Sequence, residues 1–368
     1  MSPQIEIQII AVLASIACSI PGVFLVLRQM SMMSDSISHT ILLGIVIGFF
    51  LTGDINSPLL IIGAGLMGVF TVYLSESLYK TKLVSEDASI GLVFPLLFSI
   101  AVLLISKFAS SVHLDVDSIL LGELTFAPFN RMLLFGRDIG AKAMYTMGII
   151  LLINLGLLII FFKEIKLATF DPALAAALGF SPVLIHYGLM TAVSVTAVGA
   201  FEAVGSILVI ALMTAPPITA FLLTDDLRTM LLISAVSGAV SAVLGYQAAS
   251  YFDVSIAGMI VTANGLLFLL AFIFSKKSGL IYTLMRKKRQ RLEFEMLSVA
   301  FHLKNHACTD IECIECRAST LHEHMEWDVK KLGRIIEALE RNNLIEEQDD
   351  IYSLTESGRR FVEKYEYF

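Results

Sequence analysis

Long apolar segments separated by short polar ones dominate the first 275 residues of the chain. Each is close to the roughly 20 residues that a helix needs to cross the hydrocarbon core of a membrane. The pattern predicts eight or nine spanning helices, because the stretch Gly199–Gly205 is either a tight hairpin or a break within one segment. The predicted spans are residues 6–27, 36–52, 58–79, 88–106, 143–162, 182–201, 203–223, 229–247 and 254–274.

Several predicted helix starts carry capping residues. Ser57-Pro58 and Ser181-Pro182 each place a hydroxyl at the N-cap before a proline at the first helical position. Residues 107–142 are too polar for an ordinary span, and we expect a short or re-entrant helix around 117–124. The segment Gly44–Gly48 pairs two small residues four apart, which lets neighbouring helices approach closely.

Composition separates the chain into a membrane domain and a polar tail. Apolar residues make up 56% of the chain and charged residues 16%, against about 45–50% and about 25% in soluble proteins. Residues 276–368 nevertheless carry more charged side chains than residues 1–275. We therefore predict an all-α polytopic membrane domain at residues 1–275, a basic juxtamembrane linker at 276–291 and a small α+β domain at 292–368.

The distribution of lysine and arginine predicts the orientation. Alternating the spans gathers most basic residues on one side, together with the run 286–291, and this side is expected to be cytoplasmic. The N-terminus then lies outside and the C-terminal domain in the cytoplasm. The net charge of −7 argues against a general attraction to nucleic acid.

The most informative polar residues inside the apolar segments are Asp35 and His39. They are four residues apart, so on a helix they share one face and could hold a divalent cation such as Mn²⁺, Fe²⁺ or Zn²⁺. Two other interpretations remain: an Asp–His hydrogen bond that fastens two helices, or a pair at the membrane surface near Arg28. Glu202 is either a third ligand or entry-gate acid, or a carboxylate in water at the tip of a hairpin.

The segment FLVLRQMSMMSDSISHTILLG (24–44) resembles the signature of the permeases of metal-ion ABC transporters, with Arg28, Asp35, Ser38, His39 and Gly44 at the matching places. Three further segments resemble the family in the same order: SEDASIGLVF (85–94), LLGELTF (120–126) and VGSILVIALMTAPPITA (204–220). The resemblance covers roughly residues 10–275.

This resemblance implies a multi-pass protein of the bacterial plasma membrane that imports a divalent transition metal through Asp35 and His39. We favour manganese as the cargo, with zinc or iron as alternatives, and expect no permanently bound cofactor in the permease domain. The resemblance also implies three partners: ABC ATPase subunits, an extracytoplasmic metal-binding protein and a second permease subunit. Glu202 matches no family position.

A short helix is predicted between the fifth and sixth spans, in LATFDPALAAALGFSP (167–182). Asp171 is its N-cap, Gly179 its C-terminal stop, and the small residues Ala175 and Ala176 suit close docking. It is either a connector or, by the resemblance, the coupling helix that docks on the ATPase.

The chain lacks a G-x-x-x-x-G-K-[ST] phosphate-binding loop, so we expect no ATP hydrolysis by this chain itself. We therefore expect a transport subunit rather than an enzyme. Two other functions remain open: a metal transporter driven by an ion gradient, and a membrane-tethered, metal-responsive DNA-binding regulator.

The tail carries its own signals. The run RKKRQR (286–291) favours binding to anionic lipid. Beyond it, three helices and two short strands near residues 348–350 give the order of a winged helix and resemble the winged-helix domains of metal-dependent repressors. Acidic residues on the expected recognition helix, Glu337 and Glu340, argue against DNA as the partner.

The tail also holds a group of potential metal ligands. Imidazole and thiolate ligands at such short spacing favour a structural or sensing site for Zn²⁺. Alternatively, the cysteines are small apolar core residues. The predicted ligands are His302, His306, Cys308, Cys313 and Cys316.

Overall fold

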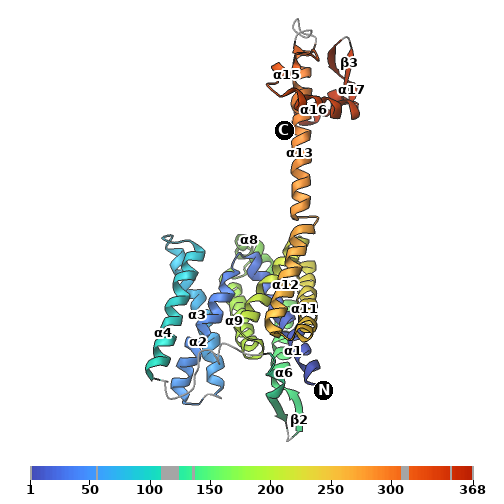
Figure 1. Cartoon of the computed structure of the whole chain (residues 1–368). Helices are drawn as coiled ribbons and strands as arrows, with labels where there is room; N and C mark the ends of the chain where they lie inside the picture. The colour runs from blue at the N-terminus through green and yellow to red at the C-terminus, as the bar shows by residue number, and fades with distance from the viewer. Residues whose placement is uncertain are drawn as a thin grey trace. The chain divides into compact units, whose positions relative to one another are not determined.

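The computed structural model describes residues 2–54, 57–108, 124–134, 137–307, 315–348 and 350–366 (Figure 1). Two compact units make up the chain, Met1–Gly279 and Leu280–Phe368. Each has its own hydrophobic core. The first unit ends close to the predicted domain boundary at residue 275.

Among the described residues, nine helices are long and apolar enough to cross a membrane, which confirms the predicted spans. These helices are α1 (Pro3–Leu27), α2 (Met32–Thr52), α3 (Pro58–Lys80), α4 (Glu86–Phe108), α6 (Lys142–Ile160), α9 (Pro182–Val204), α10 (Ser206–Leu223), α11 (Leu227–Phe252) and α12 (Ile256–Phe274). Helix α2 begins four residues before its predicted start, so Asp35 lies in its first turn.

Capping residues begin several of these helices as the sequence indicates. Ser57 Oγ accepts a hydrogen bond from the amide of Leu59, and Ser181 Oγ accepts one from the amide of Leu184. Gly205, at φ +84°, separates α9 from α10. The left-handed backbone at this glycine ends one helix directly before the next, so this segment holds two helices.

The helices of the first unit form two groups (Figure 1). Helices α2, α3 and α4 pack together, and α1, α10, α11 and α12 form the second group, with α9 contacting α1, α2, α3 and α6. The approach of α2 to α3 depends on glycine: a Cβ on Gly44 would lie 2.3 Å from the carbonyl oxygen of Gly63. Only a residue without a side chain fits there.

The polar segment before α6 contains a β-hairpin that sequence patterning did not predict. A short 3-10 helix, η1 (Ala127–Phe129), precedes the antiparallel strands β1 (Arg131–Leu134) and β2 (Arg137–Ala141). Arg131 joins the hairpin to α1 through hydrogen bonds to both carboxylate oxygens of Glu6, at 3.0 and 2.8 Å. The helix predicted around 117–124 falls almost wholly outside the described residues.

Two short helices connect α6 to α9: α7 (Phe162–Phe170), which was not predicted, and α8 (Pro172–Ala177), which was. Helix α8 is capped by Asp171, whose Oδ1 accepts a hydrogen bond from the amide of Leu174 at 2.9 Å.

The second unit begins with α13 (Leu280–His306), which includes the basic run 286–291. It continues with α15 (Leu321–His324), α16 (Val329–Arg341), the antiparallel strands β3 (Ile345–Gln348) and β4 (Ile351–Leu354), and α17 (Glu356–Glu366). The two strands lie where the sequence predicts a pair of short strands, near residues 348–350. The winged-helix interpretation of this unit stays a prediction.

Candidate functional site

Asp35 and His39 lie one turn apart on α2 and face each other. Asp35 Oδ1 is 3.4 Å from Nε2 of His39, and each side chain is 34% exposed. Because both residues belong to α2, their contact does not fasten one helix to another. The pair presents an oxygen and a nitrogen donor that an ion or a neighbouring chain could still reach.

Two aromatic rings of α4 hold the imidazole of His39 in place. The Phe94 ring stacks on it at 5.6 Å between centroids, and the Phe98 ring meets it edge-on at 5.8 Å. Such packing restricts the rotation of the imidazole and holds its nitrogens in one orientation.

Glu202 lies at the end of α9 and pairs with Lys142 at the start of α6. The Lys142 Nζ atom is 2.9 Å from Glu202 Oε1, and the two side chains are 48% and 49% exposed. An exposed ion pair of this kind is what we expect of a carboxylate in water at the tip of a hairpin. Within the part of the chain that the structure describes, no third histidine, cysteine or acid gathers with Asp35 and His39 into a three-ligand cluster.

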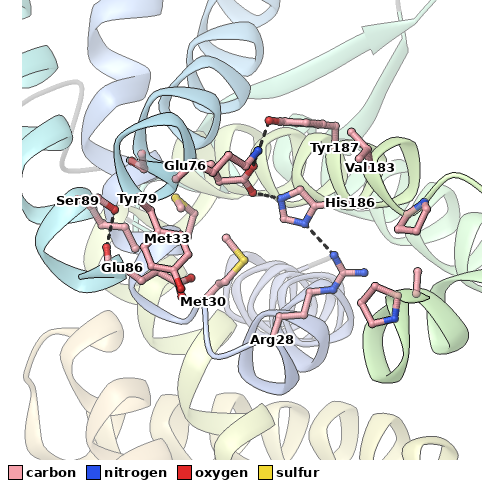
Figure 2. A pocket seen from close by; sticks show the side chains of 16 residues that line it. Arg28, Met30, Met33, Glu76, Tyr79, Glu86, Ser89, Val183, His186 and Tyr187 are labelled. Carbon is pink, nitrogen blue, oxygen red and sulfur yellow. Dashed lines mark hydrogen bonds and ion pairs between the residues drawn. The ribbon is translucent and has the colours of Figure 1, made fainter. Parts of the chain in front are cut away.

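A second polar group lies at the ends of α1, α3 and α9, and sequence reasoning missed most of it (Figure 2). Arg28 Nη1 is 2.8 Å from Nδ1 of His186, whose Nε2 in turn pairs with Glu76 Oε1. The hydroxyl of Tyr187 donates to the other oxygen of Glu76 at 3.1 Å. Of these residues only Arg28 was singled out from the sequence.

This network borders a cavity of about 350 Å³. The side chains of Glu76 and His186 are 18% and 16% exposed, so the network is largely shielded from solvent. Burial lowers the pKa of Arg28, and the charge of Glu76 opposes that shift. Polar residues within apolar spans are a signal that a sequence search could have used to find Glu76 and His186.

Arg28 also ties the network to the segment before α8. Its Nε and Nη2 atoms donate to Thr169 Oγ1 at 3.3 and 3.1 Å. Thr169 belongs to α7, and Pro172 of α8 lines the same cavity. Arg28 therefore links α7 to the network formed with α9 and α3.

Helix α8 presents an apolar surface to its surroundings. Leu174 is 46% exposed and Leu178 61%, and Ala176 beside them is exposed as well. Ala175, in contrast, is fully buried against the chain itself and is not available for docking. Gly179 ends the segment with φ +88° in open space. Of the two alanines predicted to dock, Ala176 is therefore exposed and Ala175 is covered by the chain itself.

The predicted tail ligands are only partly brought together. His302 and His306 approach each other at the end of α13, and Glu315, which the sequence did not suggest, joins them. Cys316 is buried in the core of the second unit, 1% exposed, and is not part of this cluster. Cys308 and Cys313 lie outside the described residues.

Comparisons with known proteins identify the family of the membrane-spanning unit. Residues 5–275 match the ABC 3 transport family. The zinc transport system membrane protein TroD of Treponema pallidum is 43% identical over 96% of both chains. The manganese transport system membrane protein MntD of Bacillus subtilis is 43% identical over 80% of this chain and 99% of its own length. The TroD match thus extends into the second unit.

A solved structure supports the same relationship. The structure described as PsaBC from Streptococcus pneumoniae in complex with Fab matches 76% of this chain and 94% of its own, with a TM-score of 0.62 and 28% identity. The family match, the two relatives and the shared fold agree on the membrane-spanning unit. The chain therefore belongs to the ABC 3 transport family, as a multi-pass membrane permease.

Proposed function

We propose that this chain is the membrane subunit of an importer for a divalent transition metal, driven by a separate ATPase. The observation that carries the proposal is the Asp35–His39 pair, with its two donors on one face of α2 and each side chain one-third exposed. Ionisable residues in a spanning helix are costly, and where they occur they usually mark the pathway of a substrate or an ion. A hydrated dication could exchange waters for these donors as it passes.

Manganese is our preferred cargo because a carboxylate oxygen and an imidazole nitrogen suit a borderline-to-hard cation. Zinc and iron remain alternatives, since the same donors also bind those ions. The names of the relatives support transport of a divalent metal but differ in the ion. TroD is named for zinc and MntD for manganese, and both are 43% identical to this chain.

Two donors do not complete the coordination of a transition metal, so the site needs further ligands. We assign them to water or to a second permease subunit, either an identical chain or a relative, packed against the exposed side of Asp35 and His39. An extracytoplasmic metal-binding protein would deliver the ion. Glu202, paired with Lys142, would then stand at the entrance rather than coordinate the ion.

Helix α8 is proposed as the coupling helix. The exposed Leu174, Ala176 and Leu178 offer an apolar surface that a groove on the ATPase could cover. The neighbouring residue Thr169 accepts a hydrogen bond from Arg28, which belongs to the buried polar network. ATP-driven movement of α8 would in this way reach α3 and α9.

For the orientation, the basic residues support an N-terminus outside the cell and a cytoplasmic second unit. The first turns of α13 carry the run 286–291, which we propose contacts the anionic lipid surface. In the second unit, the helices and the pair of antiparallel strands that follow α13 support the proposal of a winged-helix-like regulatory domain. Its acidic α16 residues Glu337 and Glu340 disfavour DNA as its partner.

Uptake into proteoliposomes tests this function. Vesicles are prepared with the permease and its ATPase oriented so that the ATPase side faces the lumen, and the metal-binding protein is added outside. They should accumulate radioactive manganese or zinc only when ATP is enclosed in the lumen. Uptake by the permease alone under an ion gradient would instead show a gradient-driven transporter. Metal-dependent binding of the full chain to a defined DNA sequence, without any uptake, would favour a membrane-tethered regulator.

A further inference from the structure

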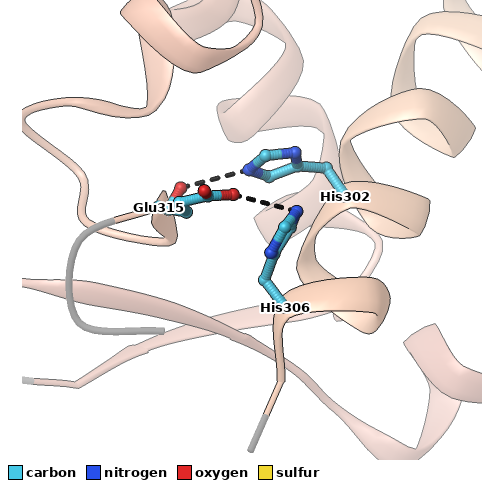
Figure 3. Close-up of side chains that lie close together, drawn as sticks. All are labelled: His302, His306 and Glu315. Atoms are coloured by element: carbon cyan, nitrogen blue, oxygen red, sulfur yellow. Dashed lines mark hydrogen bonds and ion pairs between the residues drawn. The ribbon is translucent and has the colours of Figure 1, made fainter. Parts of the chain in front are cut away.

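A cluster of ligand-type side chains lies in the second unit, separate from the Asp35–His39 pair (Figure 3). His302 and His306 are one turn apart near the end of α13, and Glu315 reaches them from a later part of the chain. One donor atom from each of the three lies within 4.8 Å of the other two. All three residues are partly exposed, so an ion in solution can reach them.

We propose that His302, His306 and Glu315 form a binding site for a divalent transition metal, with Zn²⁺ as the best fit. Two imidazoles and one carboxylate are a known set of zinc ligands, with the fourth position left to water. The proposal does not depend on the transport function, because none of these residues belongs to the membrane-spanning unit.

The contacts within the cluster are compatible with an entering cation. His306 Nε2 lies 2.9 Å from Glu315 Oε2, and His302 Nε2 lies 3.2 Å from the carbonyl oxygen of Glu315. Zinc bonds of about 2.0–2.2 Å place tetrahedral donors about 3.3–3.6 Å apart. Donors no more than 4.8 Å apart therefore need to move by only about 1 Å to coordinate one ion.

The backbone that carries the ligands is held by the core of the second unit. Leu303, next to His302, is 2% exposed, and Cys316, next to Glu315, is 1% exposed. Both belong to the same hydrophobic cluster. The ring of His302 also contacts two other imidazoles, with centroids 4.6 Å from His306 and 6.3 Å from His324. This packing limits the freedom of the ligands before metal binds, which favours affinity.

A bound ion would join the end of α13 to Glu315 and thereby stabilise the second unit. Because the ligands come together only in the folded unit, the binding free energy adds to the free energy of unfolding. Zinc binding should therefore raise the melting temperature of the folded chain, by an amount that grows with the concentration of free zinc.

Zinc binding by the full-length chain in detergent tests this site. The double variant Asp35→Asn/His39→Ala serves as the background, so that the proposed transport pair contributes no metal. We expect this background to bind one equivalent of Zn²⁺ in equilibrium dialysis. Adding His302→Ala/His306→Ala should abolish binding. Glu315→Gln should weaken it by at least the roughly 10–100-fold that loss of an outer-shell partner costs.

His322→Ala is the matched control, because His322 also lies in the second unit but is not part of the three-ligand cluster. It should leave the affinity unchanged. Co²⁺ gives a second readout that does not depend on yield: its visible absorption should appear in the background and in His322→Ala and be lost without the two histidines. Unchanged Zn²⁺ affinity in His302→Ala/His306→Ala, with the melting temperature of the metal-free chain preserved, would overturn the site.

Discussion

The guanidinium of Arg28 lies 2.8 Å from Nδ1 of His186, and this contact determines where the imidazole carries its proton. An arginine side chain can only donate hydrogen bonds, so Nδ1 must accept. The neutral imidazole therefore carries its proton on Nε2, which faces Glu76 Oε1. A positive and a negative side chain are thus joined through one imidazole in a largely buried site.

Replacing Arg28 with methionine should lower the free energy of unfolding. Methionine keeps an unbranched apolar stem but removes every donor, so Nδ1 of His186 loses its partner, at a cost of about 1–3 kcal/mol. Thermal denaturation in one detergent measures the change. Thr169→Val is the matched control: it removes only the hydroxyl that accepts from Arg28 and should cost about 0.5–1.5 kcal/mol. Equal stability of Arg28→Met and the wild type would contradict the network.

A bulky residue at the exposed surface of α8 should weaken the association with the ATPase. Ala176 is exposed, so Ala176→Trp adds volume without disturbing the packing of the chain itself. We expect the variant to fold normally but to recover less ATPase when the complex is purified. Ser250→Trp, at an exposed position near the end of α11, controls for the added ring. Normal recovery of the ATPase with Ala176→Trp would remove α8 from the coupling role.

The contact between α2 and α3 should not tolerate a methyl group at Gly44. A Cβ there would lie 2.3 Å from a backbone oxygen, so Gly44→Ala must move the two helices apart, at a cost of about 1–3 kcal/mol. Gly265→Ala in α12 is the matched control, because nothing lies within 4 Å of its added Cβ. It should be neutral or stabilising by up to about 1 kcal/mol. Equal melting temperatures of the two variants would argue against close packing.

The β-hairpin should loosen on acidification. A hydrogen bond from the Arg131 side chain holds the pKa of Asp138 below its ordinary value. A carboxyl group with a lowered pKa stabilises the fold at pH values above its unfolded pKa, and this stabilisation is lost as the pH falls through the folded pKa.

Amide hydrogen exchange at Gly140 reports on this change, because that amide donates to Asp138 Oδ1 at 3.0 Å. Its protection should fall as the pH drops through the acidic range. In Asp138→Asn the protection should be lower at neutral pH and should vary little with pH. The same pH dependence in both proteins would contradict the assignment to Asp138.

Sequence patterns predicted the spanning helices well because each apolar segment has to satisfy its backbone hydrogen bonds internally. Local capping residues such as Ser57 and Asp171 also act within a few residues, so their roles could be read directly. The same holds for the proximity of Asp35 and His39, since helical periodicity places them one turn apart.

Long-range pairs could not be found in this way. The link from Glu76 to His186 joins α3 to α9, and no local pattern states which polar residue meets which across the bundle. Glu315 is a similar case. His302 and His306 share a predicted helix face, but Glu315 belongs to a separate segment, and only the fold brings it close to them. The β-hairpin at residues 131–141 was missed because its short strands lie in a polar segment without clear alternation.

Metal uptake by an Asp35→Asn/His39→Ala variant tests the central claim most directly. The variant is reconstituted with the ATPase and compared with the wild type. Asp253→Asn is the control, since Asp253 is an exposed residue with φ +54°, a conformation that asparagine also tolerates. We predict that the double variant assembles with the ATPase but transports no manganese or zinc, while the control transports normally. Wild-type uptake by the double variant would contradict the assignment of the transport pathway to this pair.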